Sequence, residues 1–120
     1  SRGLGDVYKR QELADGALFL VEQRPLAVDE KAKVLLDDPE AREILGHAYS
    51  GLQSVSDWTA ESLDLTLRNM SEAEGIKFGK IAQPLRAALV GRTTSPGIFD
   101  VLAVLGRDES LARIADQMNT

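Results

Sequence analysis

The sequence predicts an all-α protein, a bundle of about seven short helices. Leu, Ala and charged residues dominate its 120 residues while aromatic residues make up only 5%, a balance that favours helices over sheets. Apolar residues recur at helical spacing between recognisable start and stop signals, and no stretch shows a convincing strand pattern. The length suffices for one domain, and no internal repeat of the helical-solenoid type is present.

The sequence divides after residue 11 into a short leader and a helical domain. Residues 1–11 contain two glycines and scattered charges without an amphipathic period, so we expect them to be a leader outside the domain. The helical domain then spans residues 12–120, and we leave open whether 12–55 includes the end of a preceding helical domain.

The first two predicted helices follow this leader. One starts at Glu12 and ends at Arg24-Pro25, because proline disfavours helical geometry for the residue before it. Asp29 can cap the second, which carries apolar residues up to Leu36.

The next two helices have stronger start signals. Asp38-Pro39-Glu40 combines a capping side chain, a proline at the first helical position and an acid in the first turn. Asp57 or Thr59 caps the following helix, which stops before a glycine. The apolar faces of the two helices consist of Ile44, Leu45, Ala48, Leu52 and Val55, and of Leu63, Leu67 and Met70.

Three more helices complete the chain. After an irregular link over residues 76–79, a helix runs from about Lys80 to Val90. Ser95-Pro96-Gly97 starts the next, which ends at Gly106, and Asp108 caps the last.

Composition excludes several classes of protein. Without cysteine, the chain can form neither disulfides nor thiolate metal sites, which suits a reducing cytoplasm. No apolar run approaches the ~18 residues of a membrane span, and the first residues lack the apolar core of a secretory signal. We therefore expect a cytoplasmic protein.

Catalytic chemistry has no candidate residues. The single histidine, His47, lies in a predicted helix, where a lone histidine is far more often a surface or core residue than a catalyst. Neither a phosphate loop nor a dinucleotide-binding glycine motif occurs, and the carboxylate pairs fit a solvated helix face. We expect no catalytic residue, no metal site and no cofactor in this chain.

One segment differs in charge from the rest. The net charge is −5, yet residues 75–99 hold four basic residues and no acid. A solvated helix face explains this about as well as a binding role. Binding is favoured because Lys and Arg neutralise phosphate, because Ser95-Pro96-Gly97 opens a helix with free amides, and because Pro96, Gly97 and Ile98 offer a small apolar platform for an unstacked base. The four basic residues are Lys77, Lys80, Arg86 and Arg92.

The stretch from Gly75 to Gly106 resembles the carboxy-terminal anticodon-binding domain of bacterial glutamyl-tRNA synthetase. The resemblance covers about Glu12 to Asn119 and includes Asp57-Trp58-Thr59 upstream. Its most specific part is Gln83-Pro84-Leu85-Arg86 followed by Ser95-Pro96-Gly97-Ile98-Phe99.

The resemblance implies a helical cage that holds the anticodon of tRNA for glutamate. The matching contact positions are Arg86, Ser95, Pro96, Gly97 and Ile98. Ser95 keeps the hydroxyl of the threonine found in some relatives, and Ile98 keeps the apolar character of leucine. Lys77, Lys80 and Arg92 are candidate phosphate contacts.

Other properties follow from the same resemblance. The signature motifs of the catalytic domain are absent, so the chain cannot charge tRNA alone, and ATP and Mg would belong to the catalytic domain of a parent ligase. We expect a monomer and leave open whether tRNA for glutamine is also bound. The alternative function is a helical protein-interaction domain with a basic docking segment, whereas a small helical enzyme would need an unseen cofactor.

Pro84 adds a geometric hypothesis. A proline inside a helix removes an amide donor and usually kinks the helix. Such a kink would direct Arg86 toward RNA, whereas a straight helix with Arg86 turned into an acidic neighbour would contradict the idea.

Overall fold

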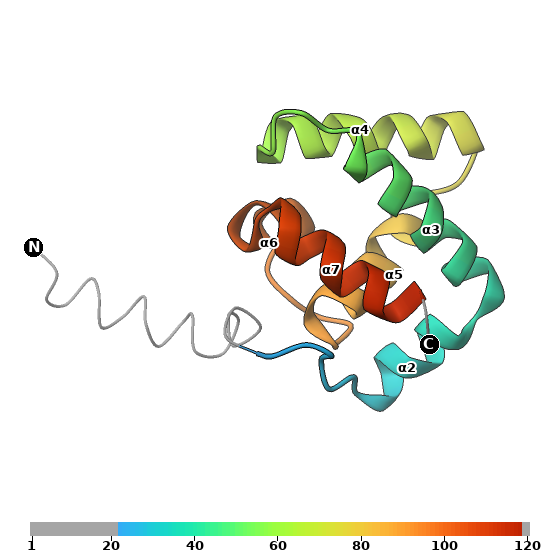
Figure 1. Ribbon diagram of the computed structural model, residues 1–120. Helices are drawn as coiled ribbons and strands as arrows, with labels where there is room; N and C mark the ends of the chain where they lie inside the picture. The colour runs from blue at the N-terminus through green and yellow to red at the C-terminus, as the bar shows by residue number, and fades with distance from the viewer. Residues whose placement is uncertain (1–21, 119–120) are drawn as a thin grey trace, which may run out of the picture.

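The computed structural model describes residues 22–118, and these fold into six helices without a strand (Figure 1). The all-α prediction is therefore confirmed for the described part of the chain. The helices are α2 (Glu30–Asp37), α3 (Pro39–Gln53), α4 (Ala60–Glu74), α5 (Phe78–Val90), α6 (Ile98–Leu105) and α7 (Arg107–Met118).

Helix α5 lies at the centre of the bundle. It contacts α2, α3, α4, α6 and α7, and α7 crosses in front of it in Figure 1. Eight of its 13 residues are buried, including Pro84 and the run from Ala87 to Val90. A helix that is apolar on most sides is stable only when surrounded, so α5 organises the core while only a narrow stripe remains for solvent or a ligand.

The predicted starts of α2, α3 and α4 are confirmed. The Asp29 carboxylate accepts a hydrogen bond from the Ala32 amide at 2.8 Å, and Asp38 accepts one from Ala41 at 3.2 Å. Of the two residues proposed for α4, Thr59 is the cap. Side-chain oxygens therefore satisfy amides that have no acceptor within their own helix.

Two predicted boundaries are wrong. Helix α5 begins at Phe78 instead of Lys80, because Lys77 takes the extended cap conformation and its carbonyl accepts the Lys80 amide. Helix α7 begins at Arg107, so Asp108 lies in its first turn and is not the cap. Gly106, at φ 84°, reverses the chain, and its carbonyl accepts the Ser110 amide.

The helix predicted from Glu12 falls mostly outside the described residues. Residues 22 and 23, its expected last turn, are not helical, and the Arg24–Pro25 peptide bond is cis. None of the six described helices combines the length and the apolar character that a membrane crossing needs.

Candidate nucleic-acid interface

A hydrogen bond joins the two halves of the predicted contact site. The Nε–H of Arg86, on α5, donates to the Ser95 hydroxyl oxygen at 2.8 Å across the loop of residues 91–97. The hydroxyl in turn donates to the Pro96 carbonyl at 2.7 Å. The structure thus brings together two residues that the sequence only placed in one segment.

Within residues 22–118, this arrangement leaves most of the Arg86 guanidinium without a hydrogen bond. Only its Nε–H is hydrogen-bonded to the part of the chain that the structure describes. The four N–H groups on its two terminal nitrogens donate no hydrogen bond to residues 22–118, and the side chain is half-buried. An arginine oriented through Nε, with its planar fork free, is suited to donate two parallel hydrogen bonds to a base edge or a phosphate.

The Ser95-Pro96-Gly97-Ile98 turn is exposed only in part. Pro96 and Gly97 are exposed, whereas Ile98 is 4% exposed and packs in the core. The interpretation of Ile98 as part of an apolar platform is therefore wrong for its side chain. An apolar surface for a base would consist of Pro96 and Gly97, and Ile98 would contribute through its backbone amide.

The N-terminus of α6 offers amides beside this turn. Gly97 caps the helix without a side-chain hydrogen bond, so the first amides of α6 have no intrahelical acceptor. The Asp100 carboxylate lies close by: a Cβ atom added at Gly97 would stand 3.4 Å from its Oδ2 atom. A negative charge there disfavours a phosphate, so these amides are better suited to a neutral base carbonyl.

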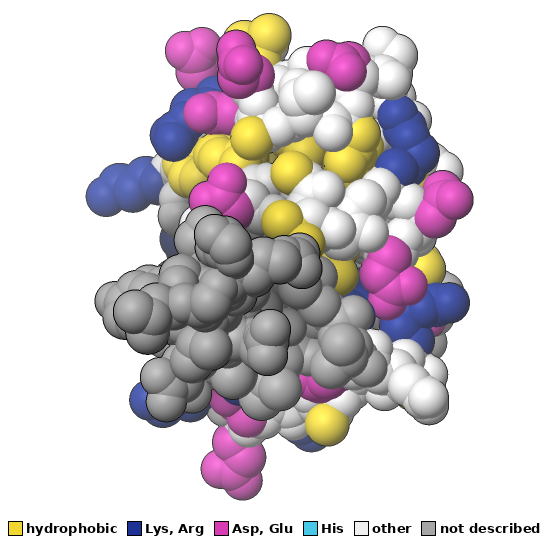
Figure 2. All heavy atoms as spheres, turned by 90° about the vertical axis from the view of Figure 1, so that its left-hand side faces the viewer, with side chains coloured by type: hydrophobic (Ala, Val, Ile, Leu, Met, Phe, Trp, Pro, Cys, Tyr) yellow, Lys and Arg dark blue, Asp and Glu magenta, His cyan; other side chains and the backbone are white. Residues whose placement is uncertain are grey.

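The segment of residues 75–99 contains no acidic residue, but acidic residues from other parts of the chain lie beside it. Lys80 Nζ lies 3.5 Å from Glu40 Oε1 on α3, and Arg92 Nη2 lies 3.8 Å from Glu22 Oε1. Basic and acidic side chains interleave around a band of hydrophobic atoms on the face shown in Figure 2. The charge contrast predicted from sequence is therefore weakened by acidic residues from α3 and from the segment before α2.

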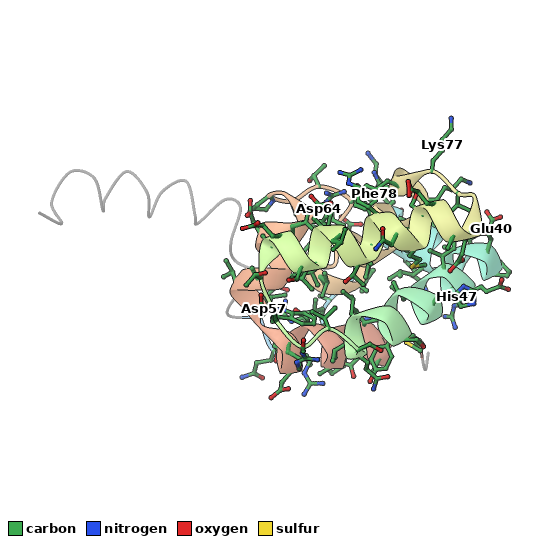
Figure 3. The ribbon with its side chains drawn as sticks, turned by 90° about the horizontal axis from the view of Figure 1, so that it is seen from above. Glu40, His47, Asp57, Asp64, Lys77 and Phe78 are labelled. Atoms are coloured by element: carbon green, nitrogen blue, oxygen red, sulfur yellow. The ribbon has the colours of Figure 1, made fainter. Side chains whose placement is uncertain are left out.

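Lys77 stands apart from these pairs. It is exposed at the start of α5 and extends away from the body of the protein (Figure 3). It forms no ion pair within residues 22–118 and borders a pocket of about 340 Å³ together with Lys80, Gln83 and residues of α2 and α3. The three candidate phosphate contacts are therefore distributed along α5 and just beyond its end.

Pro84 lies inside α5, and the helix continues through it to Val90. Arg86 is not turned into an acidic neighbour, since its Nε–H bonds to Ser95. The outcome that would have contradicted the kink hypothesis is therefore not found, while the kink itself stays a prediction.

The sequence did not predict a cation–aromatic stack next to the turn. Arg68, on α4, lies 4.2 Å from the centre of the Phe78 ring, and that ring lies 5.6 Å from the ring of Phe99. Arg68 also bonds to Asp64 at 2.9 Å. The spacing of Asp64 and Arg68 indicates an ion pair on α4, but no local signal connects either residue with Phe78.

His47 occupies an exposed position on α3 (Figure 3). Its Nδ1 lies 3.0 Å from Glu74 Oε1, and the hydrogen bond to this carboxylate raises the pKa of His47 above 6.5. Within residues 22–118, no three His, Asp or Glu side chains are placed to hold a metal ion.

Comparison with known proteins identifies the family. A family profile described as an anticodon binding domain matches residues 7–118, nearly the whole chain. The chain belongs to the anticodon binding domain family. The resemblance seen in the sequence is thereby confirmed.

Relatives of this domain are much longer proteins. Over 107 residues the chain is 65% identical to glutamate--tRNA ligase 2 of Brucella ovis, and 64% identical to glutamate--tRNA ligase 1 of Brucella melitensis. Each alignment covers 89% of this chain and 22% of the relative. The chain therefore spans about a fifth of the length of these ligases.

Two solved structures contain the same fold. A glutamate tRNA ligase from Elizabethkingia meningosepticum, in complex with its amino acid, superposes with a TM-score of 0.77 at 28% identity. The match covers 96% of this chain and 21% of that one. Glutamate-tRNA synthetase from Elizabethkingia anophelis gives a TM-score of 0.75, also at 28% identity, over 90% of this chain and 20% of that one.

Proposed function

We propose that this domain binds the anticodon of tRNA for glutamate as one part of a larger, ATP-dependent glutamate--tRNA ligase. The hydrogen bond between Arg86 and Ser95 carries the proposal, because it places a guanidinium fork beside the exposed Pro96-Gly97 turn. Single-stranded RNA loops are recognised by such combinations of hydrogen bonds to base edges and small apolar surfaces.

The chemistry at the turn divides among its residues. The free N–H groups of Arg86 donate to a base edge, Pro96 and Gly97 support the base, and the Ile98 amide donates to a base carbonyl. Ser95 holds Arg86 through its hydroxyl. This site recognises RNA and performs no bond-making step. Glutamate activation, with its ATP and Mg, then belongs to the rest of the ligase.

The phosphate contacts come from Lys77, Lys80 and Arg92. Lys77 is exposed, and the surface pairs of Lys80 with Glu40 and of Arg92 with Glu22 are weak, since exposed ion pairs contribute about 0–1 kcal/mol. A phosphate can replace either carboxylate at little cost. We further propose a monomer that acts in the cytoplasm and binds tRNA, with tRNA for glutamine as a second candidate ligand.

The test is a binding comparison at one salt concentration. The affinity of the 120-residue chain is measured for the anticodon stem-loop of glutamate tRNA and for unrelated stem-loops. Arg86→Ala should weaken glutamate-specific binding by roughly 1–3 kcal/mol, whereas Lys77→Ala should weaken all RNAs about equally. Arg107→Ala, which removes an arginine that packs on Trp58, is the control and should bind normally.

Steady-state kinetics of the full-length ligase provide a second test. There Arg86→Ala should raise the KM for tRNA while the enzyme stays folded, and the remaining domains raise the effective concentration of the anticodon. An Arg86→Ala ligase with unchanged tRNA kinetics would argue strongly against the proposal. Binding indifferent to anticodon sequence would favour the alternative, a protein-interaction domain that docks an acidic partner.

A further inference from the structure

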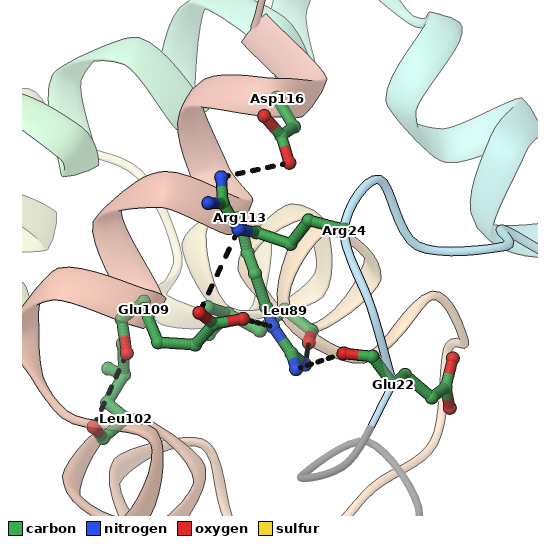
Figure 4. A network of polar contacts seen from close by, with 8 residues as sticks. Glu22, Arg24, Leu89, Leu102, Glu109, Arg113 and Asp116 are labelled. Atoms are coloured by element: carbon green, nitrogen blue, oxygen red, sulfur yellow. Dashed lines mark hydrogen bonds and ion pairs between the residues drawn. The ribbon is translucent and has the colours of Figure 1, made fainter.

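A buried arginine connects α7 with two distant parts of the chain. Arg113 is 1% exposed. Its Nε–H donates to Glu109 Oε2 at 2.7 Å, one Nη to the Leu89 carbonyl at 2.8 Å, and the other Nη to the Glu22 carbonyl at 3.2 Å (Figure 4). All three nitrogens of the guanidinium are thus engaged, and a full positive charge is held inside the protein.

The position of this charge at the C-terminal end of α5 has a physical reason. Leu89 belongs to the last turn of α5, where carbonyls have no amide donor within the helix. A cation at a helix C-terminus also interacts favourably with the helix dipole. Arg113 therefore serves as a C-terminal cap of α5 that is supplied by another helix.

The segment of residues 22–29 holds the same end of α5 from a second side. The Asp29 amide donates to the Gly91 carbonyl at 2.9 Å. Gly91 has no room for a side chain, because a Cβ atom there would stand 2.4 Å from the Ala27 carbonyl oxygen. Arg92, the next residue, pairs with Glu22. Residues 89, 91 and 92 are thus each held by this segment or by Arg113.

These contacts lie directly before the proposed recognition turn. Only residues 92–94 separate Gly91 from Ser95, whose hydroxyl binds Arg86 back on α5. The place where the chain leaves α5 therefore determines where Ser95 can lie relative to Arg86.

We propose that Arg113 and residues 22–29 form a clamp that positions the Arg86–Ser95 pair for RNA. Arg113 is then a positioning residue, since it acts through the end of α5 and does not touch the ligand. The proposal rests on the proposed anticodon function for its ligand, but its effect on Arg86 and Ser95 is measurable without RNA.

The first test uses the unmodified chain. If the clamp positions the turn, RNA bound at the turn must stabilise the clamp by the same coupling free energy. Saturating anticodon stem-loop should then slow hydrogen exchange of the Asp29 amide by about fivefold or more. The control amide is that of Ser54, which bonds to the Gly51 carbonyl at the end of α3 and should not change.

The second test uses Arg113→Lys, with Arg107→Lys on the same helix as the matched control. Lysine keeps the charge and the aliphatic stem but cannot reproduce the three-way fork. Arg107 donates to the Gln53 carbonyl, away from α5. In the absence of RNA, Arg113→Lys should shift the NMR signals of the Arg86 Nε–H and the Ser95 amide, and Arg107→Lys should not. Binding of the stem-loop should weaken about fivefold or more in Arg113→Lys alone.

The outcomes separate this inference from the proposed function. Unchanged Arg86 and Ser95 signals in a folded Arg113→Lys chain overturn the clamp, whether or not RNA binds. If Arg113→Lys does not fold, the exchange experiment decides, and an Asp29 amide indifferent to bound RNA overturns the clamp. If no RNA binds the unmodified chain, the binding proposal for the isolated domain fails, while the RNA-free NMR comparison still tests the clamp.

Discussion

The packing of residues 27–29 against the end of α5 gives a sharp stability prediction at Gly91. Its φ of 74° lies in the left-handed region, and a Cβ atom there would stand 2.4 Å from the Ala27 carbonyl oxygen. Because this neighbour is backbone, Gly91→Ala must displace residues 27–29 from the end of α5. The hydrogen bond from the Asp29 amide to the Gly91 carbonyl is then lost or lengthened.

The magnitude follows from two contributions. Placing alanine in the left-handed region costs about 1–2 kcal/mol, and losing a backbone hydrogen bond costs about 1 kcal/mol. Gly91→Ala should therefore lower the free energy of unfolding by about 2–3 kcal/mol in total. Gly75 is the matched control, because its φ of 65° is similar but an added Cβ meets no described atom within 4 Å.

Urea denaturation followed by circular dichroism measures both variants. Gly75→Ala should show only the conformational cost of about 1–2 kcal/mol, and Gly91→Ala should lose clearly more. Equal losses in the two variants would show that the segment 27–29 yields without cost, and the reasoning would be refuted. The same result would weaken the clamp, since it depends on this close packing.

Two further predictions concern local interactions. The Glu74 carboxylate raises the pKa of His47 by accepting its hydrogen bond, with a smaller contribution from Glu43, so Glu74→Gln should lower that pKa in an NMR titration. Because the pKa of His47 is raised in the folded state, the stabilisation from this pair is fully present below pH 6.5 and is lost as the pH rises through the folded-state pKa. If stability depended on pH in Glu74→Gln as it does in the unmodified protein, this assignment would be contradicted. Asp38→Ala should lower the free energy of unfolding by about 1 kcal/mol in urea denaturation, since the Ala41 amide loses its cap, and Asp38→Asn should retain most of it.

Signals between near neighbours in sequence predicted most of the helical framework. The caps at Asp29, Asp38 and Thr59 lie three residues from the amides that they bond. Gly75 and Gly91 end their helices in the left-handed conformation that glycine adopts without strain. The two misplaced starts, at Phe78 and Arg107, also have a local reason, because backbone caps leave little trace in the side-chain sequence.

The site was predicted less completely than the fold. The motif placed Arg86 and Ser95 in one segment, but nothing in the pattern indicated that the two side chains bond to each other. Ile98 looked available as an apolar surface, yet the helix it starts turns its side chain into the core. The acid-free segment acquired Glu22 and Glu40 as neighbours only when the segment before α2 and helix α3 packed beside it.

The sequence by itself determined most of the helices and the family to which the domain belongs, whereas the central place of α5 came from the packing. Helix periodicity and caps depend on residues three or four positions apart, so they can be read along the chain. Tertiary structure alone decided the two distant partners of Arg113, the carbonyls of residues 22 and 89, whereas Glu109 lies four positions away on the same helix. A buried guanidinium needs acceptors from several directions at once, and only the packed arrangement of α5, α7 and residues 22–29 provides them.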